Sequence, residues 1–392
     1  MTNSTHAFSD LDDEPIIPPP PDDEPISTAV FRTLPDALAA AAPPESTVRT
    51  IGFDNVDELL RAGYRVNRDD EHAPDVIIAR GGLIEFGIAQ ARQCKKLILV
   101  PTHDFAAVCS PLYRATDGAF AVVKRGRKPF AAVLNPENID DNLAAVFGEI
   151  VALDLAAFDL SFGAHMRGDE VDTALNADVS SLVTSLTAEL KPIAKNRTAA
   201  AQALMRAGEK CAHIVERRPE LLFASGATQT AEALRMLCTA EERIHGMRGE
   251  LETVLGAILI DFYIKNRTST RFEFPPNNGK RIDSICEFFR VDVRHACIHT
   301  TPIYPPVKMR LCEYRRHEFG KEQARMLVEL KTRHARAMQV FKRLYPDDGF
   351  GLKTLVDPTD VGLCLALAPD VFAADSMLSF LKQAGKLEKY II

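Results

Sequence analysis

The chain has 392 residues, enough for two domains, and no apolar run approaches the roughly 18 residues of a membrane-spanning helix. The N-terminus lacks a basic segment followed by an apolar one, so we expect no secretory signal and a cytoplasmic protein. The 8 cysteines are scattered without Cys-x-x-Cys pairs, which is typical of reduced, buried thiols in a cytosol.

The formal net charge of −7 can be assigned entirely to residues 1–26. This segment has no Lys or Arg, and its acidic residues are Asp10, Asp12, Asp13, Glu14, Asp22, Asp23 and Glu24. The rest of the chain is close to neutral, which argues against a nucleic-acid partner. The acidic, proline-rich composition predicts a disordered tail, either simply solvated or acting as a docking peptide for a basic partner.

Residues 27–74 carry the least regular patterns in the chain. The spacing of their apolar residues predicts a helix over Val30–Ala42, a strand over Val48–Phe53 and a second helix over Val56–Ala62.

The clearest pattern begins at Asp75. A short apolar run, Asp75–Ala79, is followed by the pair Gly81-Gly82, a helix-length segment over Leu83–Lys96 and a second apolar run, Leu97–Val100. Continuous apolar runs predict parallel strands that are buried on both faces of a sheet. The glycines fall where the first strand ends and the helix begins. Unpaired N–H groups and the positive end of the helix dipole can hold a phosphate there.

Polar residues follow the second of these strands. The turn Pro101-Thr-His-Asp104 falls at the carboxyl end of that strand, which is the usual ligand edge of an open α/β sheet. Two further strands are predicted at 119–123 and 130–134, and we expect them to pair across the basic turn 124–128.

From Ile139 onward, apolar residues recur three and four positions apart, which predicts helices. The predicted helices cover about 139–158, 170–190, 198–217, 229–239, 248–265, 281–291, 319–344 and 370–384.

The motifs between residues 81 and 111 resemble those of a known family. Archaeal-type glycerol-1-phosphate dehydrogenases, with iron-containing alcohol dehydrogenases and dehydroquinate synthases, carry a Gly-Gly-Gly turn that opens a helix, then a strand ending in Val/Ile-Pro-Thr. The glycerol-1-phosphate branch continues with Ser-His-Asp and Ser-Pro. The matching residues here are Gly81-Gly82, Val100-Pro-Thr102, His103-Asp104 and Ser110-Pro111, with Arg80 in place of the first glycine.

The resemblance implies an α/β fold class: a Rossmann-like N-terminal domain over 27–158, then an all-α C-terminal domain over 159–392. The active site would lie in the cleft between them. A cofactor, NAD or NADP, would lie near Gly81, Gly82, Thr102 and Ser110.

The same resemblance implies a divalent metal, commonly zinc or iron, held by an Asp from one helix and two His from two others as a Lewis acid. Asp169 resembles the first ligand, although it could instead cap a helix. Within Ala224–Gln229, the second ligand position falls on Gln229 in one alignment and on Ala227 in another. His245 resembles the third, but an alignment without a gap places Arg248 there. In that alternative the metal is lost, and Arg248 supplies a fixed positive charge that stabilises an oxyanion.

His103 and Asp104 would lie beside the substrate. A carboxylate at Asp104 can accept hydrogen bonds from a vicinal diol. The leading hypothesis is therefore a biosynthetic oxidoreductase that moves hydride between NAD(P) and a small polyol or polyol phosphate. One alternative is a sugar-phosphate cyclase resembling dehydroquinate synthase, which uses bound NAD catalytically. Another is a metal-free, catalytically silent binding protein. We expect a homo-oligomer, as family members often form, that binds a small molecule and neither nucleic acid nor membrane.

Overall fold

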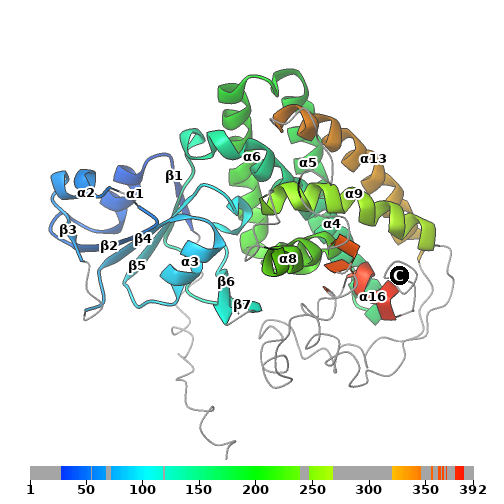
Figure 1. Ribbon diagram of the computed structural model, residues 1–392, viewed down its shortest axis with the longest axis horizontal. Helices are drawn as coiled ribbons and strands as arrows, with labels where there is room; N and C mark the ends of the chain where they lie inside the picture. Colours follow the sequence, from blue (N-terminus) through cyan, green and yellow to red (C-terminus); the bar gives the residue numbers. More distant parts are fainter. Residues whose placement is uncertain are drawn as a thin grey trace, which may run out of the picture.

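The computed structural model describes residues 28–53, 55–67, 72–117, 120–238, 247–267, 320–345, 355, 361–362, 364–365, 368 and 376–383. An α/β part is followed by a helical part (Figure 1). Among the described residues, no helix is long and apolar enough to cross a membrane. The acidic tail 1–26 and the predicted helix 281–291 lie outside the described residues.

The first part is built on a parallel sheet of six strands in the order β1-β8-β5-β4-β2-β3. The strands are β1 (Ala29–Phe31), β2 (Thr47–Ile51), β3 (Arg65–Val66), β4 (Val76–Gly81), β5 (Lys96–Pro101) and β8 (Ala131–Val133). The two strands with continuous apolar runs, β4 and β5, are neighbours in this sheet, and their apolar side chains are buried. The prediction of buried parallel strands is confirmed.

The helices of this part are α1 (Leu34–Ala41), α2 (Asp57–Arg61) and α3 (Leu83–Gln90), with the short 3-10 helices η1 (Phe105–Ala107) and η2 (Pro136–Asn142). The single helix expected over Val30–Ala42 is wrong. Its first residues form β1, and Thr33 then caps α1 by accepting a hydrogen bond from the Asp36 N–H.

The expected pairing of 119–123 with 130–134 is also wrong. Strands β6 (Leu112–Asp117) and β7 (Phe120–Arg125) form a separate antiparallel pair, while β8 joins the main sheet between β1 and β5. The segment Ala131–Val133 is small, apolar and buried. These properties suit a strand with a parallel neighbour on each side better than an exposed hairpin.

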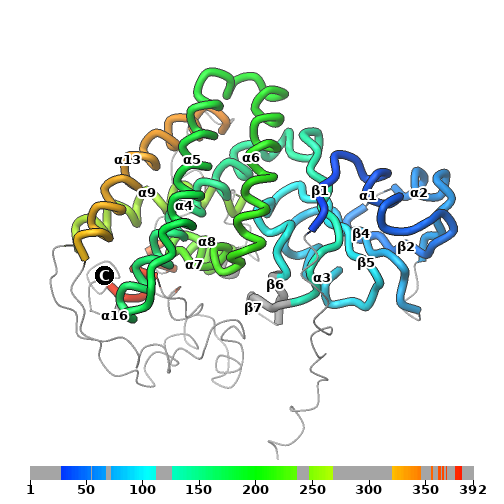
Figure 2. Tube along the Cα trace, turned by 180° about the vertical axis from the view of Figure 1, so that it is seen from behind, coloured from blue at the N-terminus to red at the C-terminus, as the bar shows by residue number. Residues whose placement is uncertain are grey.

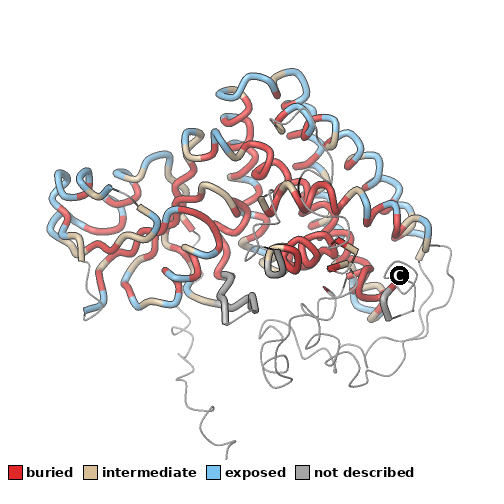
Figure 3. Tube along the Cα trace, in the orientation of Figure 1, coloured by how far each residue is buried: buried red, intermediate tan, exposed pale blue. Residues whose placement is uncertain are grey.

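Eight helices of the second part have bounds within the described residues. They are α4 (Leu143–Arg167), α5 (Thr173–Ile193), α6 (Arg197–Arg217), α7 (Leu221–Ala224), α8 (Gly226–Cys238), α9 (Arg248–Asn266), α13 (Lys321–Leu344) and α16 (Met377–Gln383); isolated helical residues near 361–365 belong to no bounded element. Helix α4 is buried along most of its length, whereas α5, α6 and α13 expose one face (Figure 3). Helix α4 runs without interruption through residue 158, the predicted end of the first domain.

Helices α4 and α9 approach each other at two glycines. A Cβ atom at Gly148 would lie 1.9 Å from the Gly249 carbonyl oxygen, and one at Gly249 would lie 1.8 Å from the Ala145 carbonyl oxygen. Only glycine allows this backbone contact. Glu149 follows Gly148 in α4, and Arg248 precedes Gly249 in α9. The contact between the two glycines therefore brings Glu149 and Arg248 to the same point along the two packed helices.

A buried carboxyl group on α4 joins two other helices. Asp159 accepts hydrogen bonds from the Gly226 N–H at the start of α8 (3.0 Å) and the Met377 N–H at the start of α16 (2.7 Å). The Tyr263 hydroxyl lies 3.5 Å from the same carboxyl. Burial raises the pKa of Asp159 to about 7, against the effect of these hydrogen bonds.

This raised pKa predicts a pH-dependent stability. Below about pH 4 the carboxyl is protonated in both the folded and the unfolded chain. Between about pH 4 and 7 only the folded chain keeps the proton, so the free energy of unfolding falls as pH rises, by up to about 1.4 kcal/mol per pH unit. Asp159→Asn has no proton to lose, and we expect it to flatten this slope in urea unfolding measured from pH 4 to 8. An unchanged slope would assign the effect to other buried carboxyls.

Candidate functional site

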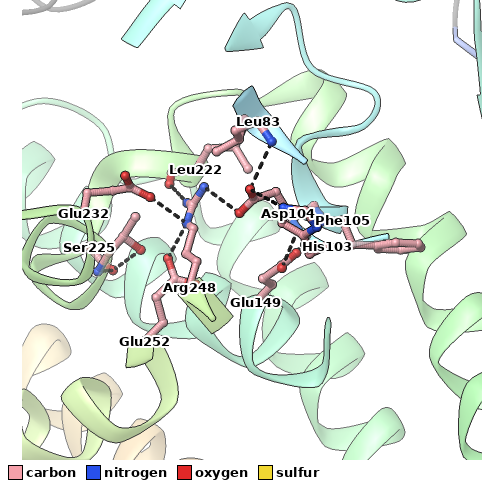
Figure 4. Close-up of polar contacts among 12 residues, drawn as sticks. Leu83, His103, Asp104, Phe105, Glu149, Leu222, Ser225, Glu232, Arg248 and Glu252 are labelled. Atoms are coloured by element: carbon pink, nitrogen blue, oxygen red, sulfur yellow. Dashed lines mark hydrogen bonds and ion pairs between the residues drawn. The ribbon is translucent and has the colours of Figure 1, made fainter. Parts of the chain in front are cut away.

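The two parts of the chain meet at one buried arginine, Arg248, the first residue of α9 (Figure 4). Its Nε donates to the Glu252 carboxylate at 2.9 Å and lies 3.7 Å from the Glu232 carboxylate of α8. Its Nη1 lies 3.9 Å from the Asp104 carboxylate, and its Nη2 donates to the Leu222 carbonyl oxygen. The guanidinium thus joins the end of β5 to three helices.

A second buried carboxyl group, Glu149 of α4, holds the turn that follows β5. The backbone N–H of Asp104 donates to Glu149 at 2.8 Å, that of Ala106 donates at 3.2 Å, and that of Phe105 also donates to it. Asp104 has a left-handed backbone, with φ of 52°. This conformation is costly for a non-glycine residue, and the three hydrogen bonds hold it in place.

We refer to Asp104, Glu149, Glu232, Arg248 and Glu252 as the Arg248 cluster. Each of these side chains is at most 6 % exposed. The cavity at their centre, which Thr228 also lines, has a volume of about 10 Å³. That is room for about one water molecule, so the described residues leave no space here for an alcohol or a nicotinamide ring.

Electrostatics within the Arg248 cluster set the protonation of its members. Burial, and then the neighbouring charge of Asp104, hold the pKa of Glu149 well above its usual range. Burial likewise raises the pKa of Glu252, against the attraction of Arg248. Burial also opposes ionisation of Asp104, but the charges of Arg235 and Arg248 outweigh it and lower the pKa of Asp104. Ionised Asp104 therefore faces Arg248, while Glu149 retains its proton more readily than an exposed glutamate.

The glycine turn at the start of α3 is occupied by carboxylates of the chain itself. Glu85 accepts a hydrogen bond from the Gly82 N–H at 2.9 Å, and Asp104 accepts one from the Leu83 N–H at 3.0 Å. A Cβ atom at Gly81 would lie 2.5 Å from the Glu85 carboxylate. A diphosphate would need these N–H groups, and it would meet negative charge at the same place.

The other residues predicted to bind the cofactor or substrate lie around this turn. The Thr102 hydroxyl is 2.9 Å from Nδ1 of His103, and Nε2 of His103 is 3.9 Å from the Asp104 carboxylate. A Cβ atom at Gly82 would lie 2.4 Å from Nε2 of His103, so the imidazole covers the glycine. Ser110 is fully buried, and its N–H donates to the Ala107 carbonyl oxygen.

Two of the predicted metal ligands, Asp169 and Gln229, have other partners in the structure. Asp169 follows the end of α4, where its side chain is 56 % exposed and pairs with Arg167 at 2.6 Å. Gln229 is buried in α8, and its amide donates to the carbonyl oxygens of Phe223 and Ala224 at 3.2 and 3.1 Å. His245 lies outside the described residues.

The side chains at the interdomain centre do not fit a divalent metal. Within the described ranges, no group of three or more His, Cys, Asp or Glu side chains could hold a metal ion. A guanidinium has no lone pair to offer and carries a permanent positive charge. Arg248 therefore fills the place where helices α4, α8 and α9 converge and repels a cation from it.

Sequence reasoning identified Asp104 and Arg248, which the structure brings together, but missed the glutamates around them. Signals for two of them were present. Glu149 interrupts the apolar run 143–153, and a buried charge of this kind needs a partner. Glu252 stands four residues after Arg248, the spacing at which helical side chains pair.

No protein-family model and no curated protein sequence matches the chain. Solved structures match its fold over most of their length. A 1,3-propanediol oxidoreductase has a TM-score of 0.56 at 13% identity, covering 94% of this chain and 99% of its own. A probable glycerol dehydrogenase from Sinorhizobium meliloti 1021 has a TM-score of 0.52 at 12% identity, covering 94% and 97%. An NADH-dependent butanol dehydrogenase A from Thermotoga maritima has a TM-score of 0.52 at 9% identity, and the match covers 94% of this chain and 96% of that protein.

The chain therefore has the fold of the iron-containing alcohol dehydrogenase and glycerol dehydrogenase group. The fold class and the resemblance predicted from the sequence are both confirmed. At identities of 9 to 13% the likeness establishes the fold, and the chemistry has to be argued from the site.

Proposed function

We propose that this protein is a metal-independent, catalytically silent member of the dehydrogenase fold, which acts by binding. The observation that carries the proposal is the position of Arg248. Its guanidinium is buried where three helices converge, and its neighbours are carboxyl groups rather than imidazoles. A buried arginine surrounded by carboxyl groups of the chain itself can act as a structural element that fastens one domain to the other.

The glycine turn supports the same proposal independently. Two N–H groups at the start of α3 already donate to Glu85 and Asp104, so the usual diphosphate position carries negative charge. Both oxidoreductase and cyclase chemistry on this scaffold would need a nicotinamide dinucleotide. A site that disfavours the diphosphate therefore counts against both.

A second candidate is hydride transfer to or from a small polyol or polyol phosphate without a metal. The turn Thr102-His103-Asp104 favours it, because a hydroxyl, an imidazole and a carboxylate lie together at the ligand edge of the sheet. In this candidate Arg248 would stabilise an oxyanion and Asp104 would accept hydrogen bonds from a diol. Catalysis would require the 10 Å³ cavity to open.

Metal analysis and nicotinamide titration on one purified sample test the proposal. The protein would be incubated with zinc or ferrous iron, dialysed, and titrated with NADH and NADPH by fluorescence. We expect far less than one metal ion per chain and no saturable nucleotide binding. We also expect no NADH or NADPH production from glycerol, 1,3-propanediol, butanol or glycerol 1-phosphate.

Three results would contradict the proposal, each in a different way. One metal ion per chain would restore a metal site that the described residues do not form. Saturable nucleotide binding with alcohol-dependent reduction would establish the second candidate. Nucleotide binding without release of reduced cofactor would point to the cyclase.

A further inference from the structure

Helices α5 and α13 line a cavity that shares no lining residue with the cavity of the Arg248 cluster. The two helices lie side by side in both views (Figures 1 and 2). The cavity between them has a volume of about 390 Å³, which lies in the range of small-molecule sites. We call it the α5–α13 groove. Its described polar lining comes from Thr184, Thr187, Lys191, Arg333, Arg336 and Gln339.

The groove carries net positive charge. Three cationic side chains line it, and none of its described lining residues is acidic. The acidic residues of α5 are engaged on the side toward α6, where Asp178 pairs with Arg217 at 2.8 Å and Glu189 pairs with Arg206. Their charges are thus neutralised away from the groove.

One of the three cations is held in a fixed orientation. Arg333 donates from Nε and Nη2 to the Asp154 carboxylate at 2.7 and 2.9 Å. Asp154 is 4 % exposed and also accepts a hydrogen bond from Ser180 at 3.3 Å. These bonds use two of the five N–H donors of the guanidinium. A side chain that is already ordered loses little entropy when it binds a ligand.

The excess positive charge comes from the other two cations. Lys191 and Arg336 are exposed and form no ion pair within the described part of the chain. The Thr184 hydroxyl and the Gln339 amide add uncharged hydrogen-bond donors beside them. Arginine, lysine and hydroxyl donors around a cavity are the groups that bind phosphate oxygens, through charge-assisted hydrogen bonds.

We propose that the α5–α13 groove binds a phosphorylated small molecule. Lys191 and Arg336 would neutralise the phosphate charge, Arg333 would offer its unused N–H donors, and Thr184 with Gln339 would complete the hydrogen bonding. This site is separate from the glycine turn and from the Arg248 cluster. It goes beyond the proposed function and stands whether or not that function is correct.

Isothermal titration calorimetry of the full-length protein with inorganic pyrophosphate tests this proposal. We expect saturable binding to one site. The double variant Lys191→Gln, Arg336→Gln should weaken it by about tenfold or more, because two charge-assisted hydrogen bonds are lost. The matched variant Arg61→Gln, Lys210→Gln removes the same two residue types at exposed positions elsewhere and should bind as the wild type does.

All substitutions lie at exposed positions, so thermal unfolding should be unchanged in both double variants. Equal weakening in both would mean that general surface charge attracts the probe, and it would overturn the proposal. Unchanged binding in the groove variant would place the probe elsewhere, for example at the glycine turn. Absence of saturable binding to the wild type at millimolar pyrophosphate would also overturn it.

Discussion

Replacing Arg248 by methionine is expected to lower the free energy of unfolding by about 3–5 kcal/mol, the cost of removing one partner from a buried ion pair. The guanidinium lies 3.7 Å from the Glu232 carboxylate and 2.9 Å from that of Glu252, and its charge helps to lower the pKa of Asp104. Without it, these carboxyls must stay charged in a low-dielectric interior or take up protons. Urea unfolding at neutral pH measures the change, and we expect the loss to be smaller at low pH.

Two control variants separate burial from charge. Arg325 pairs with Glu322 and Glu329 on the exposed face of α13, so Arg325→Met should lower the free energy of unfolding far less than Arg248→Met does. Arg248→Lys keeps the positive charge but loses the planar guanidinium group. The stability of this variant should lie between that of Arg248→Met and that of the wild type. An Arg248→Met variant as stable as wild type would show that this side chain does not hold the domains together. A catalytic role for it would then become the better explanation.

Replacing Gly249 by alanine is expected to destabilise the protein by about 3 kcal/mol or more, at the upper end for overpacked cores. The new Cβ would lie 1.8 Å from the Ala145 carbonyl oxygen and 2.8 Å from the Glu149 N–H nitrogen. Backbone atoms cannot rotate away as a side chain can, so α4 and α9 must separate. Their separation would also displace Arg248 from the carboxyls it joins. Thermal unfolding and near-ultraviolet circular dichroism would measure both effects.

Gly168 provides the contrast for this prediction. It ends α4 in a left-handed conformation with φ of 78°, and nothing lies within 4 Å of the place where its Cβ would be. Gly168→Ala should therefore cost only the backbone term, about 1–2 kcal/mol. If Gly249→Ala cost no more than Gly168→Ala, the close approach of α4 and α9 would not be required for the fold.

The fold class could be predicted because its signals are local. Two continuous apolar runs, separated by a glycine turn and a helix, suffice for a parallel βαβ unit. Three- and four-residue periodicity likewise suffices for most of the long helices that follow. The pairing partners of a strand could not be predicted in this way, because an apolar run such as Ala131–Val133 fits a hairpin or an interior sheet position equally well. Only the assembled sheet, with a place between β1 and β5, decided between them.

The candidate site divides in the same way. The sequence by itself determined the residue types: a His103-Asp104 turn after β5, a glycine pair opening α3, and an arginine at position 248, which an alignment without a gap predicts to replace a metal ligand. Only the tertiary structure decided what they face. Glu149 comes from a helix distant in sequence and Glu232 from α8, and they lie near Arg248 because the helices pack there. Whether a buried charge binds a ligand or a neighbour depends on the groups within a few ångströms, and sequence spacing does not specify them.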